Sequence, residues 1–303
     1  MIKKYNLDSS LVNYIDNLGM GVEARGALGG TVYYVENNSG NDAWDGLSID
    51  RAFKTLAKAI SVSNLDMARR ARWARRNTIY LWSDYTTESL VAFPNKCDVV
   101  GCGSYDGNTQ PGILGHHVPV NDDNYGTRFL NLWLKSTGAA APIITLASSS
   151  SGFQIGRSTL TTNGTTTIGI QATASPFLKV FSNRFEGAFA TSYMTFGTGE
   201  AGGTEIVGNT MVDAAASGIV AGSGMTSSWG SVIKDNLISA AGITINDAAS
   251  LFYTSGNKLM SAATVTGIAT PLEALVVNEA RAADNWLTAA NVAGPHPLVD
   301  TTT

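Results

Sequence analysis

The sequence V-F-S-N-R-F at residues 180–185 returns in altered form through the second half of the chain. It reads I-V-G-N-T-M at 206–211, I-K-D-N-L-I at 233–238, T-S-G-N-K-L at 254–259 and A-A-D-N-W-L at 282–287. The asparagines that these segments share are Asn183, Asn209, Asn236, Asn257 and Asn285, at intervals of 26, 27, 21 and 28 residues. Self-similarity at this period indicates stacked units, because one unit alone cannot bury its apolar face.

Two earlier segments keep the same interval. F-L-N-L-W-L at 129–134 places Asn131 25 residues before Gly156, and F-Q-I-G-R-S at 153–158 places Gly156 in the asparagine position. Each unit combines an alternating apolar stretch with small residues and is poor in helix formers. We therefore predict an all-β fold, a parallel β-helix over residues 78–290, whose asparagines occupy equivalent turns and bond from one rung to the next. The alternative, a β-sandwich, would scatter such turns at about 8–12 residues.

The composition is consistent with such a coil. Glycine supplies 32 of 303 residues, and charged residues only 15%. Glycine adopts the positive φ of tight turns, and small inward side chains let rungs stack about 4.8 Å apart. The formal net charge of −4 indicates no general attraction to nucleic acid.

Residues 32–60 contain a strand at 32–35, the loop S-G-N-D-A-W-D-G-L and a predicted helix at 50–61 with apolar residues at helical spacing. This segment resembles the opening of right-handed parallel β-helix proteins of the pectate-lyase-like class, where a loop S-G-x-D-x-x-D-G-L and a helix A-F-x-T-L-x-x-A-I cap one end. The resemblance implies a right-handed β-helix with an N-terminal capping helix. It says little about function, because lyases, hydrolases, phage tailspikes and non-catalytic virion proteins share the scaffold.

The chain divides into an extended N-terminal arm (1–30), an opening strand and capping helix (31–77), the β-helix (78–290) and a C-terminal tail (291–303). A short helix in the arm would carry one apolar face, made of Leu11, Val12, Ile15 and Leu18. A helix of about ten residues is marginal alone in water, so it needs a surface to dock on. That surface is either the end of its own β-helix or another subunit or particle.

A basic run follows the capping helix. It consists of Arg69, Arg70, Arg72, Arg75 and Arg76. Arginines in such a run usually form the solvated face of a helix, with their aliphatic stems lying across apolar neighbours. Contact with an acidic partner protein is the first alternative, and contact with nucleic acid is the less favoured one.

Asp122 and Asp123, next to His116 and His117, form the group that most resembles a catalytic site. Paired carboxylates can supply a general acid and base, or hold Ca²⁺ in a lyase. The β-helix polygalacturonases, however, follow their Asp-Asp pair with G-H-G and R-x-K motifs, which this sequence lacks. Asn-Asp-Asp-Asn is also ordinary turn chemistry. We therefore expect no catalytic site, no metal and no cofactor.

Cys97 and Cys102 flank a predicted strand, where a disulfide would need a sharp bend, so two buried thiols are favoured over a disulfide. The N-terminus lacks the apolar run of a signal peptide, and no apolar stretch is long enough to span a membrane. Four phenylalanines are predicted to face outward, and burial of that face favours a homotrimer. They are Phe177, Phe181, Phe185 and Phe189.

These features predict a non-enzymatic structural protein of a phage particle, made in the host cytoplasm and located in the virion. It would be a capsid decoration (cement) protein or a tail-associated protein, attached through its N-terminal arm to other virion proteins such as the major capsid protein. No nucleic-acid or membrane partner is expected. The alternative is a tailspike-type enzyme that binds or depolymerises a polysaccharide.

Overall fold

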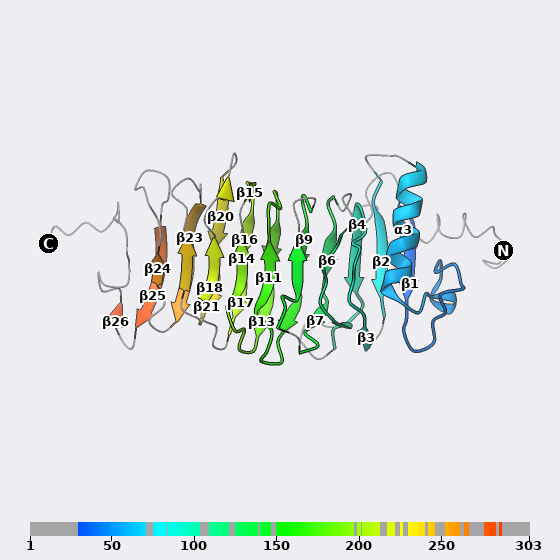
Figure 1. The fold of residues 1–303 in the computed structure, drawn as a ribbon, viewed down its shortest axis with the longest axis horizontal. Helices are drawn as coiled ribbons and strands as arrows, with labels where there is room; N and C mark the ends of the chain where they lie inside the picture. The colour runs from blue at the N-terminus through cyan, green and yellow to red at the C-terminus, as the bar shows by residue number, and fades with distance from the viewer. Residues whose placement is uncertain are drawn as a thin grey trace, which may run out of the picture.

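The computed structural model describes residues 30–70, 75–82, 84–103, 109–120, 125–138, 140–146, 150–196 and 202–212. It also describes 199–200, 217–221, 225–226, 230–239, 242–245, 252–260, 264–266, 276–282 and 285–286. In these residues the chain winds into a right-handed parallel β-helix, drawn in Figure 1 with its long axis horizontal. The predicted fold class is confirmed.

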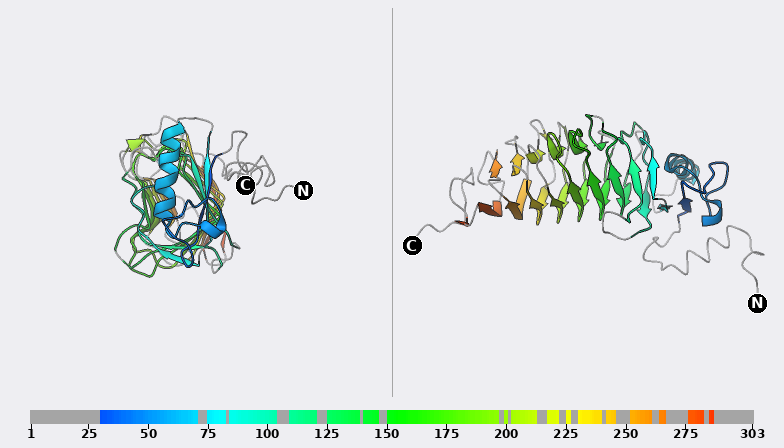
Figure 2. Two further views of the ribbon diagram at one scale, coloured as in Figure 1. Left: turned by 90° about the vertical axis from the view of Figure 1, so that its right-hand side faces the viewer. Right: turned by 90° about the horizontal axis from the view of Figure 1, so that it is seen from below.

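Three faces of parallel strands run along the coil (Figures 1 and 2). The first face contains β1 (Val32–Val35), β2 (Asn77–Leu81), β4 (Cys97–Gly101), β6 (Arg128–Leu130), β9 (Gln154–Gly156), β12 (Lys179–Phe181), β16 (Glu205–Val207), β20 (Ser231–Lys234), β23 (Phe252–Met260) and β25 (Val276–Ala282). The second contains β3 (Tyr85–Thr87), β5 (Gly112–Leu114), β7 (Trp133–Lys135), β10 (Thr159–Thr161), β13 (Arg184–Glu186), β17 (Thr210–Met211) and β21 (Leu237–Ile238), and then joins β23.

The third face contains β8 (Ile144–Leu146), β11 (Ile168–Ala172), β14 (Ser192–Phe196), β18 (Ser217–Ala221), β22 (Gly242–Ile245) and β24 (Thr264–Thr266). A short pair, β15 (Gly199–Glu200) and β19 (Met225–Thr226), lies outside these three faces.

The core is a set of apolar stacks, because the parallel register places like residues above one another. On the first face the stack is Ile79, Val99, Phe129, Ile155, Val180, Ile206 and Ile233, all fully buried. On the second face it is Ile113, Leu134, Leu160, Phe185, Met211 and Ile238. On the third it is Ile144, Ile170, Met194 and Ile219. Burial of these side chains supplies the main driving force for folding.

The bend between the first and second faces holds the predicted asparagine ladder. Asn183 Nδ2 donates to Asn209 Oδ1 at 3.0 Å, and this unit repeats from Asn209 to Asn236 and from Asn236 to Asn257, each at 2.9 Å. Each Oδ1 also accepts the backbone N–H of the preceding asparagine, as Asn209 Oδ1 accepts that of Asn183. The second amide hydrogen donates to a carbonyl one rung back, such as that of Ile155. The ladder is therefore confirmed for these four residues, all of which are buried.

The ladder continues toward the N-terminus in a different way from the prediction. The register pairs Gly156 with Phe181, so the residue in the asparagine position is Ser158. The Ser158 backbone N–H donates to Asn183 Oδ1 at 3.0 Å, and its hydroxyl accepts the N–H of Leu132 at 3.1 Å. The prediction that Gly156 occupies this position was wrong. It was based on the spacing in the sequence, whereas the pairing of the strands decides which residues are equivalent.

Asn131 belongs to a second column, one residue before the ladder position. The members of this column share a positive φ of 51–66° and are Asn131, Arg157, Ser182, Gly208, Asp235 and Gly256. This left-handed conformation turns the chain sharply from the first face to the second, and it favours glycine and asparagine.

Asn285 does not continue the ladder. It lies in β26 (Asn285–Trp286), which pairs antiparallel with β25 through Ala282 and Asn285. An antiparallel strand reverses direction and cannot repeat a parallel turn. The register instead places Asn278 opposite the bulge at Gly256 and Asn257.

Helix α3 (Leu56–Arg70) covers the N-terminal end of the coil, as the left view of Figure 2 shows. It begins at Leu56 and not near Asp50 as predicted. The reason is that Phe53 exchanges backbone bonds with Tyr34 and Glu36, which holds this segment extended beside β1. Thr55 then caps the helix by accepting the Lys58 N–H at 3.2 Å.

Two distant carboxylates fix the start of α3. Asp42 Oδ1 accepts the N–H groups of Lys54 and Thr55 at 2.8 and 2.9 Å. Glu88 accepts those of Leu56 and Ala57 at 3.0 and 2.8 Å. Negative groups at this position satisfy otherwise unpaired N–H groups and complement the helix dipole.

The predicted outward row of phenylalanines is only half right. Phe177 is 44% exposed and Phe181 is half-buried, but Phe185 and Phe189 are buried in the core. Their rings pack edge to face on Tyr193, at 5.9 and 5.4 Å between centroids. The turn at Ser182 resets the in–out alternation, so Phe185 faces inward.

We expect Asn209→Ala to lower the free energy of unfolding by about 2–4 kcal/mol, because it leaves buried donors and acceptors on both neighbouring rungs unpaired. Chemical denaturation measures the effect. The matched control is Asn163→Ala at an exposed turn, where a change below about 0.5 kcal/mol is expected. Equal losses in the two variants would show that the ladder contributes nothing specific.

Candidate ligand-binding groove

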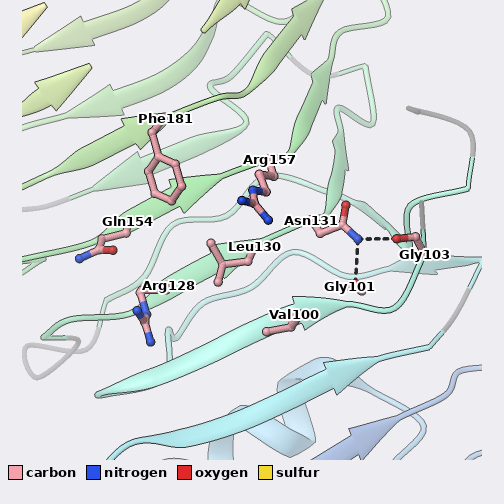
Figure 3. Close-up of a pocket in the computed structure, with 9 residues that line it drawn as sticks. All are labelled: Val100, Gly101, Gly103, Arg128, Leu130, Asn131, Gln154, Arg157 and Phe181. Atoms are coloured by element: carbon pink, nitrogen blue, oxygen red, sulfur yellow. Dashed lines mark hydrogen bonds between the residues drawn. The ribbon is translucent and has the colours of Figure 1, made fainter. Parts of the chain in front are cut away.

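A groove of about 550 Å³ lies on the outer surface of the first face, and we call it the outer groove. It is lined by Val100, Gly101, Gly103, Arg128, Leu130, Asn131, Gln154, Arg157 and Phe181 (Figure 3). Its lining residues come from β4, β6, β9 and β12 and from the turns that follow β4, β6 and β9.

The parallel register builds the floor of the outer groove from two rows of outward residues. One row passes from Val100 through Leu130 and Gly156 to Phe181. The other passes from Arg128 to Gln154 on the next strand. One apolar row therefore lies beside a polar row.

Gly156 leaves room for the ring of Phe181. A side-chain carbon built on Gly156 would lie 2.2 Å from the edge of that ring, which is far inside van der Waals contact. The glycine is thus required by a close approach of the aromatic ring and not by its own turn. The ring leans over β9 and forms one wall of the outer groove.

Arg157 is the exposed cation of the outer groove. Its φ of 51° places it in the left-handed column, and its guanidinium forms no ion pair with the described residues. Figure 3 shows this side chain between Phe181 and Asn131. A long side chain in the left-handed region costs about 1–2 kcal/mol relative to an ordinary conformation.

The rim beside Arg157 is held by a buried amide. Gln110 is 2% exposed and donates to Asn131 Oδ1 at 3.0 Å and to the carbonyl of Arg157 at 2.8 Å. It also accepts from the Thr159 hydroxyl at 2.8 Å. Asn131 Nδ2 donates to the carbonyls of Gly101 and Gly103 at 2.9 and 2.7 Å. The rim is therefore positioned before any ligand arrives.

At the other end, Arg128 is part of an internal ion-pair cluster. Its Nε donates to Asp98 Oδ1 at 2.6 Å, and its Nη2 binds Asp98 Oδ2. Arg76 binds the same carboxylate, which is nearly buried. Burial lowers the pKa of the Arg76 guanidinium, and the charge of Asp98 opposes that shift.

The basic run identified in the sequence does not form one surface in the described residues. Arg75 is buried and pairs with Asp66 at 3.0 Å, and Arg76 pairs with Asp98. Arg69 and Arg70 end α3, but their side chains and the whole of Arg72 lie outside the described residues. Arg75 and Arg76 therefore stabilise the fold through ion pairs within the chain.

Asp122 and Asp123 also lie outside the described residues. Of their neighbours, His116 donates a hydrogen bond from Nδ1 to the carbonyl oxygen of Pro142 at 2.8 Å. His117 is fully buried, and its Nδ1 accepts the Leu90 N–H at 3.2 Å. Burial, with a smaller effect from His116, lowers the pKa of His117 to about 3, so its ring is neutral. This histidine is part of the core.

The cysteines are both free thiols. Cys97 is buried, which raises its pKa to about 12, and Cys102 is half-buried. The apolar arm residues Leu11, Val12, Ile15 and Leu18 lie outside the described residues. Among the described residues, no cluster of His, Cys, Asp and Glu is arranged to hold a metal ion, and no helix is long and apolar enough to cross a membrane.

The outer groove was not predicted from the sequence. A signal was present, since F-Q-I-G-R-S places an arginine where later units have serine, glycine or aspartate. Comparison of the chain with protein-family models, curated proteins and solved structures finds no match. The groove must therefore be interpreted from its own chemistry.

The buried His117 predicts a pH dependence of stability. Its pKa rises from about 3 in the folded chain to about 6.5 in the unfolded chain, so the unfolded state binds more protons between these values. Stability should therefore fall as pH drops through this window. We expect His117→Gln to reduce the difference in unfolding free energy between pH 7 and pH 4 by about 3 kcal/mol. Urea denaturation at both pH values measures it, and an unchanged difference would contradict the assignment.

Proposed function

We propose that this chain is a non-enzymatic structural protein of a phage particle, either a capsid decoration (cement) protein or a tail-associated protein. Two features support the proposal. The segment at 32–60 resembles the opening of β-helix proteins that include phage virion proteins, and the structure carries it as a strand and a helix over one end of the coil. Attachment to other virion proteins, such as the major capsid protein, is assigned to the N-terminal arm.

The observation that carries the non-enzymatic role is that three carboxylates are bound to other groups of the same chain. Asp98 lies between two arginines, Glu205 pairs with Lys179 at 2.8 Å, and Glu88 caps α3. Hydrolysis of a glycosidic bond needs two carboxylates that flank the bond and can exchange protons. These three side chains stabilise the fold and are not placed for that exchange.

A tailspike-type polysaccharide-binding or depolymerising enzyme is the second candidate. The observation that favours it is an aromatic pair on the second face. Tyr85 is 41% exposed, and its ring lies 5.2 Å from that of Trp133, centroid to centroid. The two rings together form a broad apolar surface with polar groups at its edges.

Two assays test the proposal. We expect the full chain to release no unsaturated products or new reducing ends from uronic-acid and capsular polysaccharides. We also expect antibodies against the chain to detect it in gradient-purified particles. Turnover that Asp122→Asn or Asp123→Asn abolishes would favour the enzyme. Detection only in the particle-free fraction would refute the particle assignment.

We also propose that the chain is a homotrimer. An exposed apolar patch supports this proposal, whereas Phe185 and Phe189 do not, because both are buried. Val91, Val118 and Val120 are 65%, 44% and 76% exposed, and backbone bonds from Val118 and Val120 to β-helix residues 90 and 91 place them side by side. Burial of such a patch between subunits is favourable.

Light scattering is expected to give three times the chain mass of 31.8 kDa. Val120→Lys should shift the mass toward the monomer, because it places a charge in an apolar contact. Leu65→Lys, at a residue of α3 that is 54% exposed, is the matched control and should leave the mass unchanged. A monomer at micromolar concentration in the unaltered chain would contradict the trimer.

A further inference from the structure

We propose that the outer groove docks a peptide segment in which an Asp or Glu side chain lies next to a bulky apolar side chain. The inference deepens the proposed function, since such a segment would belong to a neighbouring protein in the assembly. It rests on the charge, the hydrogen-bonding capacity and the shape of the outer groove.

The outer groove attracts an anion. Arg157 is exposed and forms no ion pair with the described residues, and Arg128 keeps a third of its side chain exposed beside its pair with Asp98. Among the described residues, no carboxylate lines the outer groove. A guanidinium with free N–H groups binds a carboxylate through two parallel hydrogen bonds.

The hydrogen-bonding groups favour a peptide over a sugar. Both ends of the Asn131 amide are engaged within the protein. Within the described part of the chain, the side-chain amide of Gln154 and the guanidinium of Arg157 are the polar groups that remain for a ligand. Sugar hydroxyls need acceptors as well as donors. Here donors dominate, which matches a carboxylate better than a ring of hydroxyl groups.

The walls supply the apolar half of the site. Val100 and Leu130 form an aliphatic floor, and the Phe181 ring stands beside it across Gly156 (Figure 3). A leucine or phenylalanine side chain placed there would lose contact with water on several sides. Its neighbouring acidic residue would then lie beside Arg157.

The backbone at Arg157 gives a separate reason to assign a role to its side chain. Other positions of the left-handed column hold Asn131, Ser182, Gly208 and Gly256, which are short or lack a side chain. A long side chain kept in this conformation has a conformational cost that a glycine would avoid. Arg157 therefore places a charge at a position where the backbone conformation favours glycine.

This conformation allows a test that separates binding from folding. A library of displayed random-sequence peptides is selected for binding to the full chain. The enriched peptides are then synthesised, and their affinities for the chain are measured. We expect them to carry Asp or Glu beside Leu, Ile or Phe. Arg157→Gly should weaken their binding at least about tenfold while the melting temperature stays equal or rises. Arg157→Lys should show an intermediate loss, because it keeps the charge without the two-pronged geometry.

Phe181→Ala should also weaken binding about tenfold, through loss of the aromatic wall. The matched control is Arg51→Ala. Arg51 is exposed, ends the short 3-10 helix η2 (Ile49–Arg51) and pairs with Asp45, so this variant should bind the peptides within about twofold of the unaltered chain. Enriched peptides without acidic residues, or binding that survives Arg157→Gly, would overturn the proposal. So would binding of uronic-acid glycans, measured in parallel, with no peptide enriched. None of these three results depends on whether the chain is found in particles.

Discussion

The structure depends on one requirement, that the buried amides at the bend between the first and second faces find partners along the axis of the coil. Each asparagine from Asn183 to Asn236 donates to the next rung and to the preceding rung, and each side-chain oxygen from Asn209 to Asn257 accepts two N–H groups. A slip of one residue would break all of these bonds and also turn the apolar stacks outward. The ladder therefore fixes the register of two faces at once.

The outer groove is a consequence of the same bend. The residue before each ladder position adopts a left-handed conformation, and its side chain is free of the core, so its identity can vary without disturbing the stacks. Where this residue is Arg157, and where the preceding residue is Gly156, a cation lies beside a gap that the Phe181 ring borders. A single rung thus differs from its neighbours in surface chemistry while it shares their backbone.

Much of the fold could be predicted because the ladder needs the same side chain on successive rungs. Asn183, Asn209, Asn236 and Asn257 therefore recur in the sequence and were identified by their spacing. The prediction failed where another group meets the same requirement. At Ser158 a hydroxyl and a backbone N–H take over the role, and near the last described rungs the register favours residue 278 over 285.

The groove could not be predicted for a related reason. In an uninterrupted strand, residues four apart point to the same side, so Phe181 and Phe185 would share a face. The left-handed Ser182 between them resets the alternation, and one ring then lines the outer groove while the other enters the core. Outward residues can be assigned only after the bend on each rung is located. Once it is located, the outward position next to the ladder becomes the place where a repetitive coil can acquire a specific site, because a change there leaves both the buried amides and the apolar stacks intact.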